Sequence, residues 1–393
     1  MNSAIYNTGT RKMYYYFLFW MIDCYVEPPY REYPPLVNFI SSAQDEIRQF
    51  SFLYDEKVMA RYIYYYFENS NLLKKLFRDI DKSKDFLFQK YPHPFLAVAY
   101  DTKTLRLIHN EFYLLLKRAL FLNQCVWNLD ISGNLFLSKN LLSKGFGFQD
   151  IQLLTLSDKR GYLEAENEDF LKVCLTYFKN KKIGRRLLLK HLNKYEYISI
   201  SYADERPKNL DDYLKQINSL EVRNSGGIKK LIHQKEADYK NSIRERDKLF
   251  KTIKDKNIQK TILLLRQAIY GKDYFRGLFS QITHYYINPI INECSRRWKV
   301  NPNNLRKLNF VEFNKFFQGK RVDWSVINKR IGDNAAGVID GRSFMYFAKK
   351  AKSFKNKYFK DDISTPKNLT GVVANPGRTK GRVCICLTHD DFK

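Results

Sequence analysis

The chain has 393 residues, which is long enough for two or three domains. Its 44% hydrophobic and 16% aromatic residues can bury a substantial core, so the composition excludes an intrinsically disordered protein. The net charge of +27 is uneven, because residues 1–150 carry 18 basic and 15 acidic side chains whereas residues 251–393 carry 29 and 11. A basic half suits an anionic partner. Lys, Asn, Ile, Tyr and Phe are all abundant, however, as in proteins of AT-rich genomes, so nucleic acid is not the partner that we expect.

Neither the cysteines nor the N-terminal residues predict export or a membrane span. The six cysteines have no framework spacing, which predicts reduced thiols in a cytoplasmic protein. Residues 13–22 form an apolar run after two cations, but a membrane span needs about 20 such residues. No small-residue cleavage site follows, so the run predicts a buried helix or strand, with secretion as the alternative. We therefore expect no membrane partner.

The first half of the chain is mostly helical by pattern. Apolar residues recur at helical spacing over residues 37–90 and again over residues 105–122. A short alternating run with a Ser-Gly turn predicts a small β-hairpin near residues 127–137. Residues 163–195 are predicted to be helical, with an interruption near residues 180–184.

The second half predicts two long helices joined by a tight reversal. Residues 225–227, Ser-Gly-Gly, make the best internal hinge. A narrow apolar stripe follows over residues 228–253, residues 254–257 reverse the chain, and a second stripe runs toward a kink at Pro289. We therefore expect an antiparallel helical hairpin, followed by shorter helices.

No catalytic or metal-binding motif is complete in the sequence. The Walker loop G-x-x-x-x-G-K-[ST] is absent, and residues 145–150 keep only two of the three glycines of a dinucleotide fingerprint. Cys384 and Cys386 would share one face of a strand, but no second Cys or His pair completes a zinc site. We assign no catalytic residue and no metal ligand.

Several polar and aromatic side chains are interpreted as structural. His191 and His284 have no Ser-His-Asp or Cys-His constellation around them. Glu166, Glu168 and Asp169 are interpreted as the solvated start of a helix. Aromatic residues that alternate with Lys and Arg in the C-terminal half could stack nucleobases. We prefer the interpretation that they pack on the apolar face of an amphipathic helix. These aromatic residues are Phe313, Phe316, Phe317 and Trp324.

The last segment changes to β-type spacing around a glycine-rich turn. Its skeleton is Gly371-x-x-Ala374-x-Pro376-Gly377-x-x-x-Gly381-x-Val383. Pro376 fixes φ at the first central position of a turn and Gly377 supplies the positive φ of the second, which is typical of a type II turn. Small residues at 374 and 381 allow close packing of the backbone. The segment therefore predicts strand, turn, strand.

This pattern, GVVANPGRTKGRVCI, resembles the start of the phosphohistidine (swivelling) domain of phosphoenolpyruvate-utilising enzymes. That family includes phosphoenolpyruvate synthase, pyruvate phosphate dikinase and rifampin phosphotransferase. The preceding stretches LLLRQAIYGKDYFR and INECSRRW are similar to the helical segment that leads into the domain. The resemblance covers about residues 228–393, whereas residues 1–227 match only loosely. It implies a phosphotransferase or kinase of the pyruvate, water dikinase class.

In that family, a histidine on a glycine-rich loop takes a phosphoryl group at one site, and the domain rotates to deliver it at another. The resemblance implies Mg²⁺ and ATP or phosphoenolpyruvate as cofactors and a small anionic substrate. It also implies a separate ATP-grasp domain or chain as a partner. The family's histidine lies downstream of the turn, beyond Lys393, and His389 lacks the flanking glycines. We therefore expect these 393 residues to be inactive alone.

The expected fold is mostly α-helical (α+β) and has three regions. Residues 1–225 form a helical region with a small β element, and residues 226–365 form the long helical hairpin and linker helices. Residues 366–393 form the first strands of an α/β swivelling domain. Two other functions remain open: a non-catalytic helical scaffold or regulatory protein, and a basic nucleic-acid-binding protein with steeply salt-dependent affinity.

Overall fold

The computed structural model describes residues 4–12, 18, 21–22, 26, 39–44, 47–54, 56–69, 71–199, 206–330, 333–339 and 342–358. Helices make up most of these residues, so the expectation of a mostly α-helical fold is confirmed. The predicted strands of the swivelling domain lie outside the described residues, and so do Cys384, Cys386 and His389.

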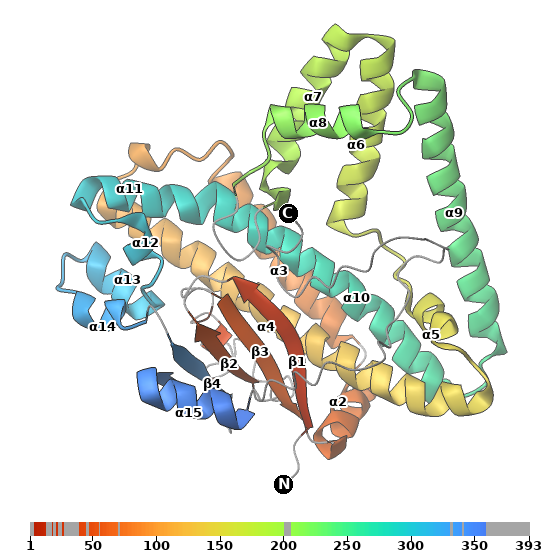
Figure 1. Cartoon of the computed structure of the whole chain (residues 1–393), viewed down its shortest axis with the longest axis horizontal. Coiled ribbons are helices and arrows are strands. Elements are labelled where there is room, and N and C mark those ends of the chain that lie inside the picture. The colour runs from red at the N-terminus through yellow and green to blue at the C-terminus, as the bar shows by residue number, and fades with distance from the viewer. Residues whose placement is uncertain are drawn as a thin grey trace, which may run out of the picture.

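The molecule is built around α4 (Thr102–Leu141), a helix of 40 residues (Figure 1). Asp101 caps its first turn, where the Asp101 carboxylate accepts a hydrogen bond of 2.6 Å from the Thr104 N–H. Helices α2 (Glu56–Glu68), α3 (Leu72–Lys90) and α10 (Lys256–Ile282) all pack against α4. Apolar residues therefore spread over most of its circumference, as expected for a helix that is buried on several sides.

The β-hairpin predicted near residues 127–137 is wrong, because these residues continue α4. The Ser-Gly pair that suggested a turn lies inside the helix. A Cβ atom at Gly133 would lie 2.7 Å from Cδ2 of Leu265 on α10. Glycine here permits two helices to approach closely and does not mark a turn.

Five strands form one antiparallel sheet in the order β1-β3-β2-β4-β5. The sheet pairs β2 near the N-terminus with β4 from the second half, and the Ser41 hydroxyl donates to the Ala336 carbonyl at 2.9 Å. Helix was predicted for all of residues 37–90, which is wrong for β2 and β3 and correct for α2 and α3. The strands are β1 (Ala4–Lys12), β2 (Phe39–Gln44), β3 (Ile47–Tyr54), β4 (Asn334–Ile339) and β5 (Arg342–Phe347).

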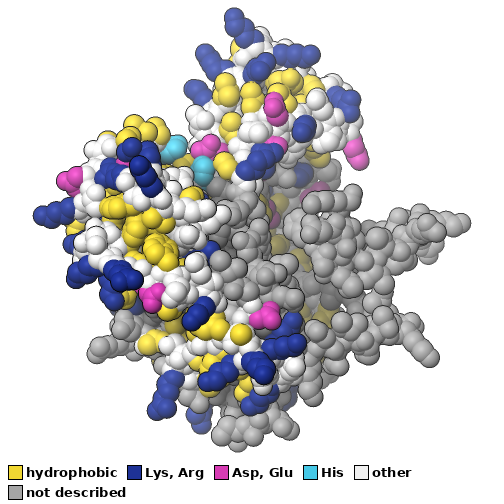
Figure 2. Space-filling view, turned by 60° about the vertical axis from the view of Figure 1, so that its left-hand side comes forward, with side chains coloured by type: hydrophobic (Ala, Val, Ile, Leu, Met, Phe, Trp, Pro, Cys, Tyr) yellow, Lys and Arg dark blue, Asp and Glu magenta, His cyan; other side chains and the backbone are white. Residues whose placement is uncertain are grey.

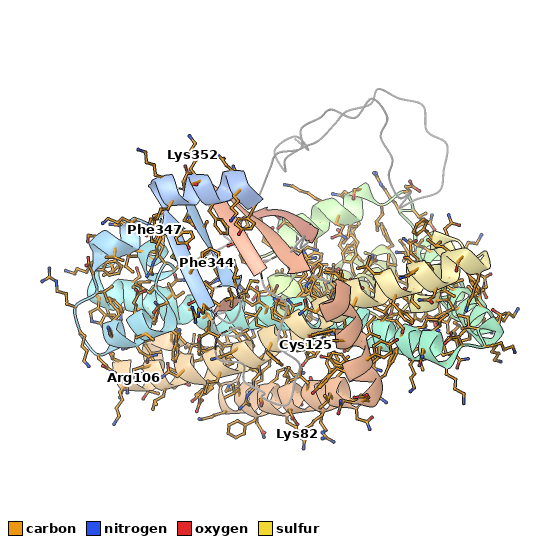
Figure 3. All side chains as sticks on the ribbon, turned by 90° about the horizontal axis from the view of Figure 1, so that it is seen from below. Lys82, Arg106, Cys125, Phe344, Phe347 and Lys352 are labelled. Atoms are coloured by element: carbon orange, nitrogen blue, oxygen red, sulfur yellow. The ribbon has the colours of Figure 1, made fainter. Side chains whose placement is uncertain are left out.

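The sheet lies between the helical core and α15 (Ala348–Tyr358), as Figures 1 and 3 show. Ala336 and Val338 of β4 are buried in the main core. Phe344 and Tyr346 of β5 contact Phe354 of α15, with ring centroids 5.0 and 5.8 Å apart. The alternation of strand side chains thus places α15 on the face of the sheet opposite the core.

The predicted reversal between two long helices is present, but the helices diverge from it (Figure 1). Asp255 caps α10 just after α9 (Ser225–Thr252) ends. Helix α9 then packs on α5 (Phe148–Thr155) and α6 (Tyr162–Lys179), whereas α10 packs mainly on α4. The two apolar stripes therefore pack in different cores over most of their length, but the end of α9 and the start of α10 share a small core with α4 and α5. The residues predicted as a hinge form the first turn of α9, which the Asn224 side chain caps.

Helices α6, α7 (Lys181–Tyr195) and α8 (Leu210–Ser219) form a unit that we call the α6–α8 lobe; the rest we call the body (Figure 1). The predicted interruption is confirmed, since Asn180 ends α6 and its side chain caps α7. The lobe has its own small core, which the first turn of α9 completes through Ile228. The 3₁₀ turn η3 (Glu196–Ser199) follows α7 and reaches the body, where Tyr197 joins the main core.

The remaining elements complete the body. A π-helical turn, η4 (Thr283–Ile287), continues α10, and Pro289, where a kink was predicted, stands in the first turn of the helix that follows. The main core contains residues from both sides of the predicted boundary at 225/226. Within the described ranges, no helix is both long and apolar enough to cross a membrane. The other helices are η1 (Ala97–Ala99), η2 (Leu142–Lys144), α11 (Asn288–Trp298), α12 (Pro302–Leu305), α13 (Phe310–Phe317) and α14 (Trp324–Asn328).

Candidate functional site

Three of the six histidines gather where the α6–α8 lobe meets the body. We divide their surroundings into two sets. The Glu166 network lies inside the lobe and consists of Glu166, His191, Lys208 and Tyr213. The joint cluster lies between lobe and body and consists of His93, Glu196, Tyr197, His284 and Tyr285.

In the Glu166 network, one carboxylate oxygen receives three hydrogen bonds. Oε1 of Glu166 accepts from the Tyr213 hydroxyl at 2.8 Å, from His191 Nε2 at 3.3 Å and from Lys208 Nζ at 3.4 Å. A carboxylate only accepts, so this contact requires the proton of His191 to sit on Nε2. Glu166, His191 and Tyr213 are 5%, 5% and 0% exposed. The network thus ties together α6, α7 and α8 around a buried charge.

The interpretation of Glu166 as a solvated acid is therefore wrong. Burial alone would raise the pKa of Glu166, but the hydrogen bond from His191 and the charge of Lys208 outweigh it and lower that pKa below its usual value. Burial and the negative charge of Glu166 raise the pKa of Tyr213. The carboxylate is charged and its donors are committed, so this network stabilises the lobe and leaves no free base. His191 is structural, as predicted.

The other two acids of the predicted solvated start are half-buried and paired. Glu168 forms an ion pair with Arg160. Asp169 accepts hydrogen bonds of 2.7 Å from Lys194 Nζ and from the Tyr195 hydroxyl. These pairs link α6 to the loop before it and to the end of α7.

The joint cluster is arranged around the ring of Tyr285 on the π-helical turn η4. The imidazole of His93 lies 4.1 Å from it and that of His284 lies 4.9 Å away, between ring centroids. His284 Nε2 lies 3.1 Å from Oε1 of Glu196 on η3. The Tyr285 hydroxyl donates to the Asn193 carbonyl at 3.1 Å. The cluster therefore joins the body to the last turn of the lobe, and histidine side chains reach the surface at this joint (Figure 2).

The groups of the joint cluster differ in their protonation and in their exposure to solvent. Burial raises the pKa of Tyr197 to about 12, so its hydroxyl stays protonated at neutral pH. Partial burial lowers the pKa of His93, against the charge of Glu196. The His93 imidazole is exposed and neutral at pH 7, and a neutral imidazole can accept a proton or act as a nucleophile. Among the groups of the two sets, it is the one best suited to chemistry.

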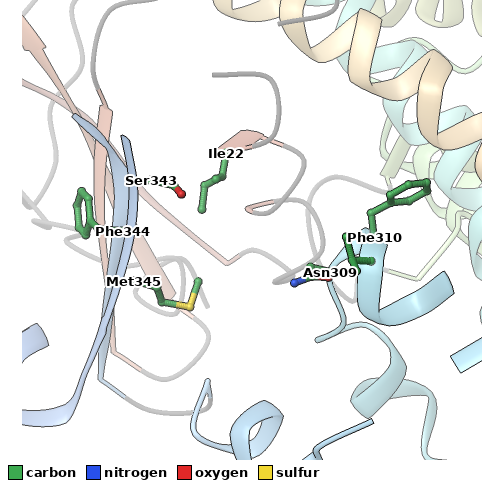
Figure 4. Close-up of a pocket in the computed structure, with 7 residues that line it drawn as sticks. Ile22, Asn309, Phe310, Ser343, Phe344 and Met345 are labelled. Atoms are coloured by element: carbon green, nitrogen blue, oxygen red, sulfur yellow. The ribbon is translucent and has the colours of Figure 1, made fainter. Parts of the chain in front are cut away.

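A separate cavity of about 310 Å³ lies between β5 and the start of α13 (Figure 4). Most of its lining is apolar, and its polar groups are Asn309 and Ser343. The Asn309 side chain already caps α13, where it accepts from the Glu312 N–H. The cavity thus offers one side-chain hydroxyl and no charged side chain among its described lining residues. The complete described lining is Ile22, Asn309, Phe310, Val311, Ser343, Phe344 and Met345.

The structure also places several other residues that the sequence analysis singled out. Phe313, Phe316 and Phe317 are buried in the main core and pack as predicted. Residues 145–150 would form a loop if read from their glycines alone; Gly145, with a φ of 87°, and Gly147 do lie in a loop, but residues 148–150 form the first turn of α5. Cys125, Cys174 and Cys294 are free, buried thiols. Within the described ranges, no three His, Cys, Asp or Glu side chains are placed to hold a metal ion.

The family motif, Gly371, Ala374, Pro376, Gly377, Gly381 and Val383, lies outside the described residues. The structure reveals two features that the sequence interpretation missed, the contact of Glu166 with His191 and the joint cluster. A signal was available, because Glu166 and Phe170, like His191 and Tyr195, are four residues apart. That spacing puts each polar residue on the apolar, buried face of its helix. No family model and no curated protein sequence matches the chain.

Proposed function

We propose that the chain is part of a phosphotransferase of the phosphoenolpyruvate-utilising family. The observation that carries the proposal is the segment Gly371-x-x-Ala374-x-Pro376-Gly377-x-x-x-Gly381-x-Val383, which resembles the opening of that family's swivelling domain. The motif begins 13 residues after α15 ends at Tyr358, so the described helices precede it in the chain as the resemblance requires. The described residues, body and lobe together, would then be the part of the protein from which a mobile carrier domain extends.

The proposed chemistry uses a neutral imidazole of the carrier domain as the nucleophile. The imidazole nitrogen attacks a phosphorus atom of ATP or the phosphorus of phosphoenolpyruvate, and the P–O bond to the leaving nucleotide or to the enolate of pyruvate breaks as the N–P bond forms. An oxygen of a small anionic acceptor then attacks this phosphorus, and the N–P bond breaks to release the histidine. Phosphoryl transfer needs cations that neutralise the phosphates, and we assign Mg²⁺ and nucleotide binding to an ATP-grasp domain or partner chain. A cytoplasmic location fits the three buried, free thiols.

The test compares the 393-residue chain with a longer chain whose reading frame continues beyond Lys393 for about one domain, about 100 residues. Each is incubated with Mg²⁺ and ³²P-labelled ATP or phosphoenolpyruvate, both alone and with an ATP-grasp domain of the same family supplied as a separate chain. We expect an acid-labile, alkali-stable phosphoprotein from the longer chain and none from the 393-residue chain. Self-labelling of the 393-residue chain, or a longer chain that takes no label from either donor, would overturn the proposal and favour a non-catalytic scaffold.

Two matched substitutions sharpen this test in the longer chain. Gly377→Val removes the residue that can adopt the positive φ of the turn, so labelling should fall at least tenfold. Thr379→Val introduces the same valine outside the central turn positions, where a β-branched side chain is already present, and should keep most of the labelling. Equal labelling of the two variants would show that the turn has no part in the carrier.

A further inference from the structure

One stretch of the α6–α8 lobe is basic without interruption. Between Asp169 and Glu196 the sequence contains eight Lys and Arg residues and no Asp or Glu, whereas the whole chain has 68 basic and 41 acidic residues. Residues 341–360 and 363–389 also lack Asp and Glu, so the way in which this stretch displays its cations, and not the missing acids alone, carries the inference. This stretch forms the end of α6 and all of α7.

Six of the eight cations lie along the outer part of the lobe, from the turn between α6 and α7 to Lys190 in the third turn of α7. Lys172 and Lys194 are the other two, and both pair with Asp169. The six are exposed, and none forms an ion pair with any residue that the structure describes. Figure 2 shows the basic side chains that cover the top of the lobe. We call this set the basic tip; it consists of Lys179, Lys181, Lys182, Arg185, Arg186 and Lys190.

The spacing of the basic tip is unfavourable for the isolated helix. Lys182, Arg186 and Lys190 follow one another at four-residue intervals, which places like charges about 6 Å apart along α7. Lys181 and Lys182 stand in the first turn, where the helix dipole favours acids, and α7 has no acid there. Both effects destabilise α7 on its own, and an anionic partner would reverse both.

The apolar face of α7 is already occupied inside the lobe. Leu188, His191 and Tyr195 are buried, and Gly184 packs so closely that a Cβ there would lie 2.2 Å from Cα of Tyr177. The outward side of α7 carries the cations, and Ile183 and Leu189, each 44% exposed, stand among them and do not form a continuous apolar face. A helix that binds a membrane needs a free apolar face to insert, and α7 has none. A phosphate backbone requires only the row of cations.

We propose that the basic tip binds the phosphate backbone of nucleic acid, without base recognition. This differs from the interpretation of the sequence, in which the aromatic residues of the C-terminal half were the candidates for stacking. Phe313, Phe316 and Phe317 are buried and cannot stack bases, and Trp324 is half-buried against the same core, where its ring contacts Phe316. The binding surface lies instead in the lobe. The proposal is independent of phosphoryl transfer and stands or falls separately from it.

The experiment uses two variants of the whole chain that lose the same charge at opposite ends of the molecule. The tip variant is Lys182→Gln/Arg185→Gln/Arg186→Gln. The control variant is Lys349→Gln/Lys350→Gln/Lys352→Gln on α15. These three lysines are exposed and form no ion pair with any described residue. Figure 3 shows Lys352 directed away from the sheet. All six positions are exposed, so both variants should fold, which circular dichroism checks.

Affinity for a short fluorescent duplex DNA and for a single-stranded RNA is measured by anisotropy across a salt series. If all six cations engage duplex phosphates, the slope of log K against log salt is about −5, and the tip variant should reduce it by about 2.7. The tip variant should bind at least tenfold more weakly at low salt, and the control variant should stay within about twofold of the parent.

Three results would overturn the proposal. Equal weakening by the two variants would mean that total charge alone drives binding. A salt-independent affinity, or no binding to either nucleic acid at low salt, would exclude a phosphate interface. Tighter binding to phosphatidylserine-containing vesicles than to nucleic acid, lost in the tip variant, would assign the surface to a membrane.

Discussion

The body and the α6–α8 lobe are stabilised in different ways. The body surrounds α4 with apolar side chains from several helices and from the sheet, and Phe112, Leu116 and Leu120 are each at most 1% exposed. The lobe buries fewer apolar side chains and places a charged carboxylate, Glu166, among its three helices. Substitutions in the core of the body should therefore destabilise the whole fold, whereas substitutions in the lobe should unfold the lobe first.

The largest expected effect is in the body. Phe112→Ala should lower the free energy of unfolding by about 4 kcal/mol, because it leaves a cavity beside a fully buried ring. The Phe112 ring stacks on Tyr286 with centroids 4.0 Å apart. Urea unfolding followed by tryptophan fluorescence measures the change. Leu114→Ala, at a position 53% exposed on the same helix, should cost less than about 0.5 kcal/mol. Similar costs for the two would contradict a core centred on α4.

In the lobe, Glu166→Ala should cost about 3 kcal/mol, since it leaves the buried donors of His191 and Tyr213 and the half-buried Lys208 without their acceptor. Hydrogen exchange should speed up in α6, α7 and α8 and remain slow in α4. Glu168→Ala is the matched control, because its pair with Arg160 is partly exposed and Arg160 also binds Glu236. That change should cost less than about 1 kcal/mol. Faster exchange in α4 as well would show that lobe and body unfold together.

The free energy of unfolding of the body should depend on pH through His109, a buried side chain of α4. Burial lowers the pKa of His109 to about 4 from an ordinary value near 6.5, and its ring stacks on Phe313 at 4.5 Å. The unfolded chain binds the proton more readily, so stability should fall as the pH drops from 6.5 toward 4, by up to about 3 kcal/mol. Urea midpoints between pH 7 and 4.5 measure this loss. His109→Phe should flatten the dependence, and an unchanged slope would exclude His109 as its source.

The smallest expected effect concerns the contact of α6 with α7. Gly184→Ala should cost about 2 kcal/mol, because the new methyl group would meet the backbone of Tyr177. Gly226→Ala adds the same group near the start of α9, where the nearest heavy atom lies 3.5 Å away, and should be neutral or slightly stabilising. Thermal unfolding monitored by exchange in the lobe compares them. A neutral Gly184→Ala would mean that α6 and α7 are held less closely than described.

The sequence predicted the elements that depend on local pattern. The helix over residues 105–122 and the break near Asn180 follow from apolar spacing and from a capping side chain. Residues 39–54 were misassigned because β2 finds its partner β4 about 295 residues away, which no local window reveals. Gly133 was misassigned because its role depends on Leu265 of another helix.

The candidate site was less accessible to prediction than the fold. His93, Glu196 and His284 are distant in sequence, and only the packing of the lobe on the body brings them together. Glu166 could be recognised as buried from its spacing to Phe170, but its three donors come from α7, α8 and the segment before α8. The basic tip, in contrast, is visible in the sequence as a stretch without acids, although its exposure is not.

The central claim is that phosphoryl transfer passes through a histidine of the carrier domain. The most direct measurement locates the phosphohistidine by mass spectrometry of the labelled longer chain under alkaline conditions. We predict that the phosphoryl group lies in a peptide beyond Lys393, not on His389, and that His93→Gln leaves the labelling unchanged. Phosphorylation of His93 or His284, the histidines at the joint between lobe and body, would contradict this account.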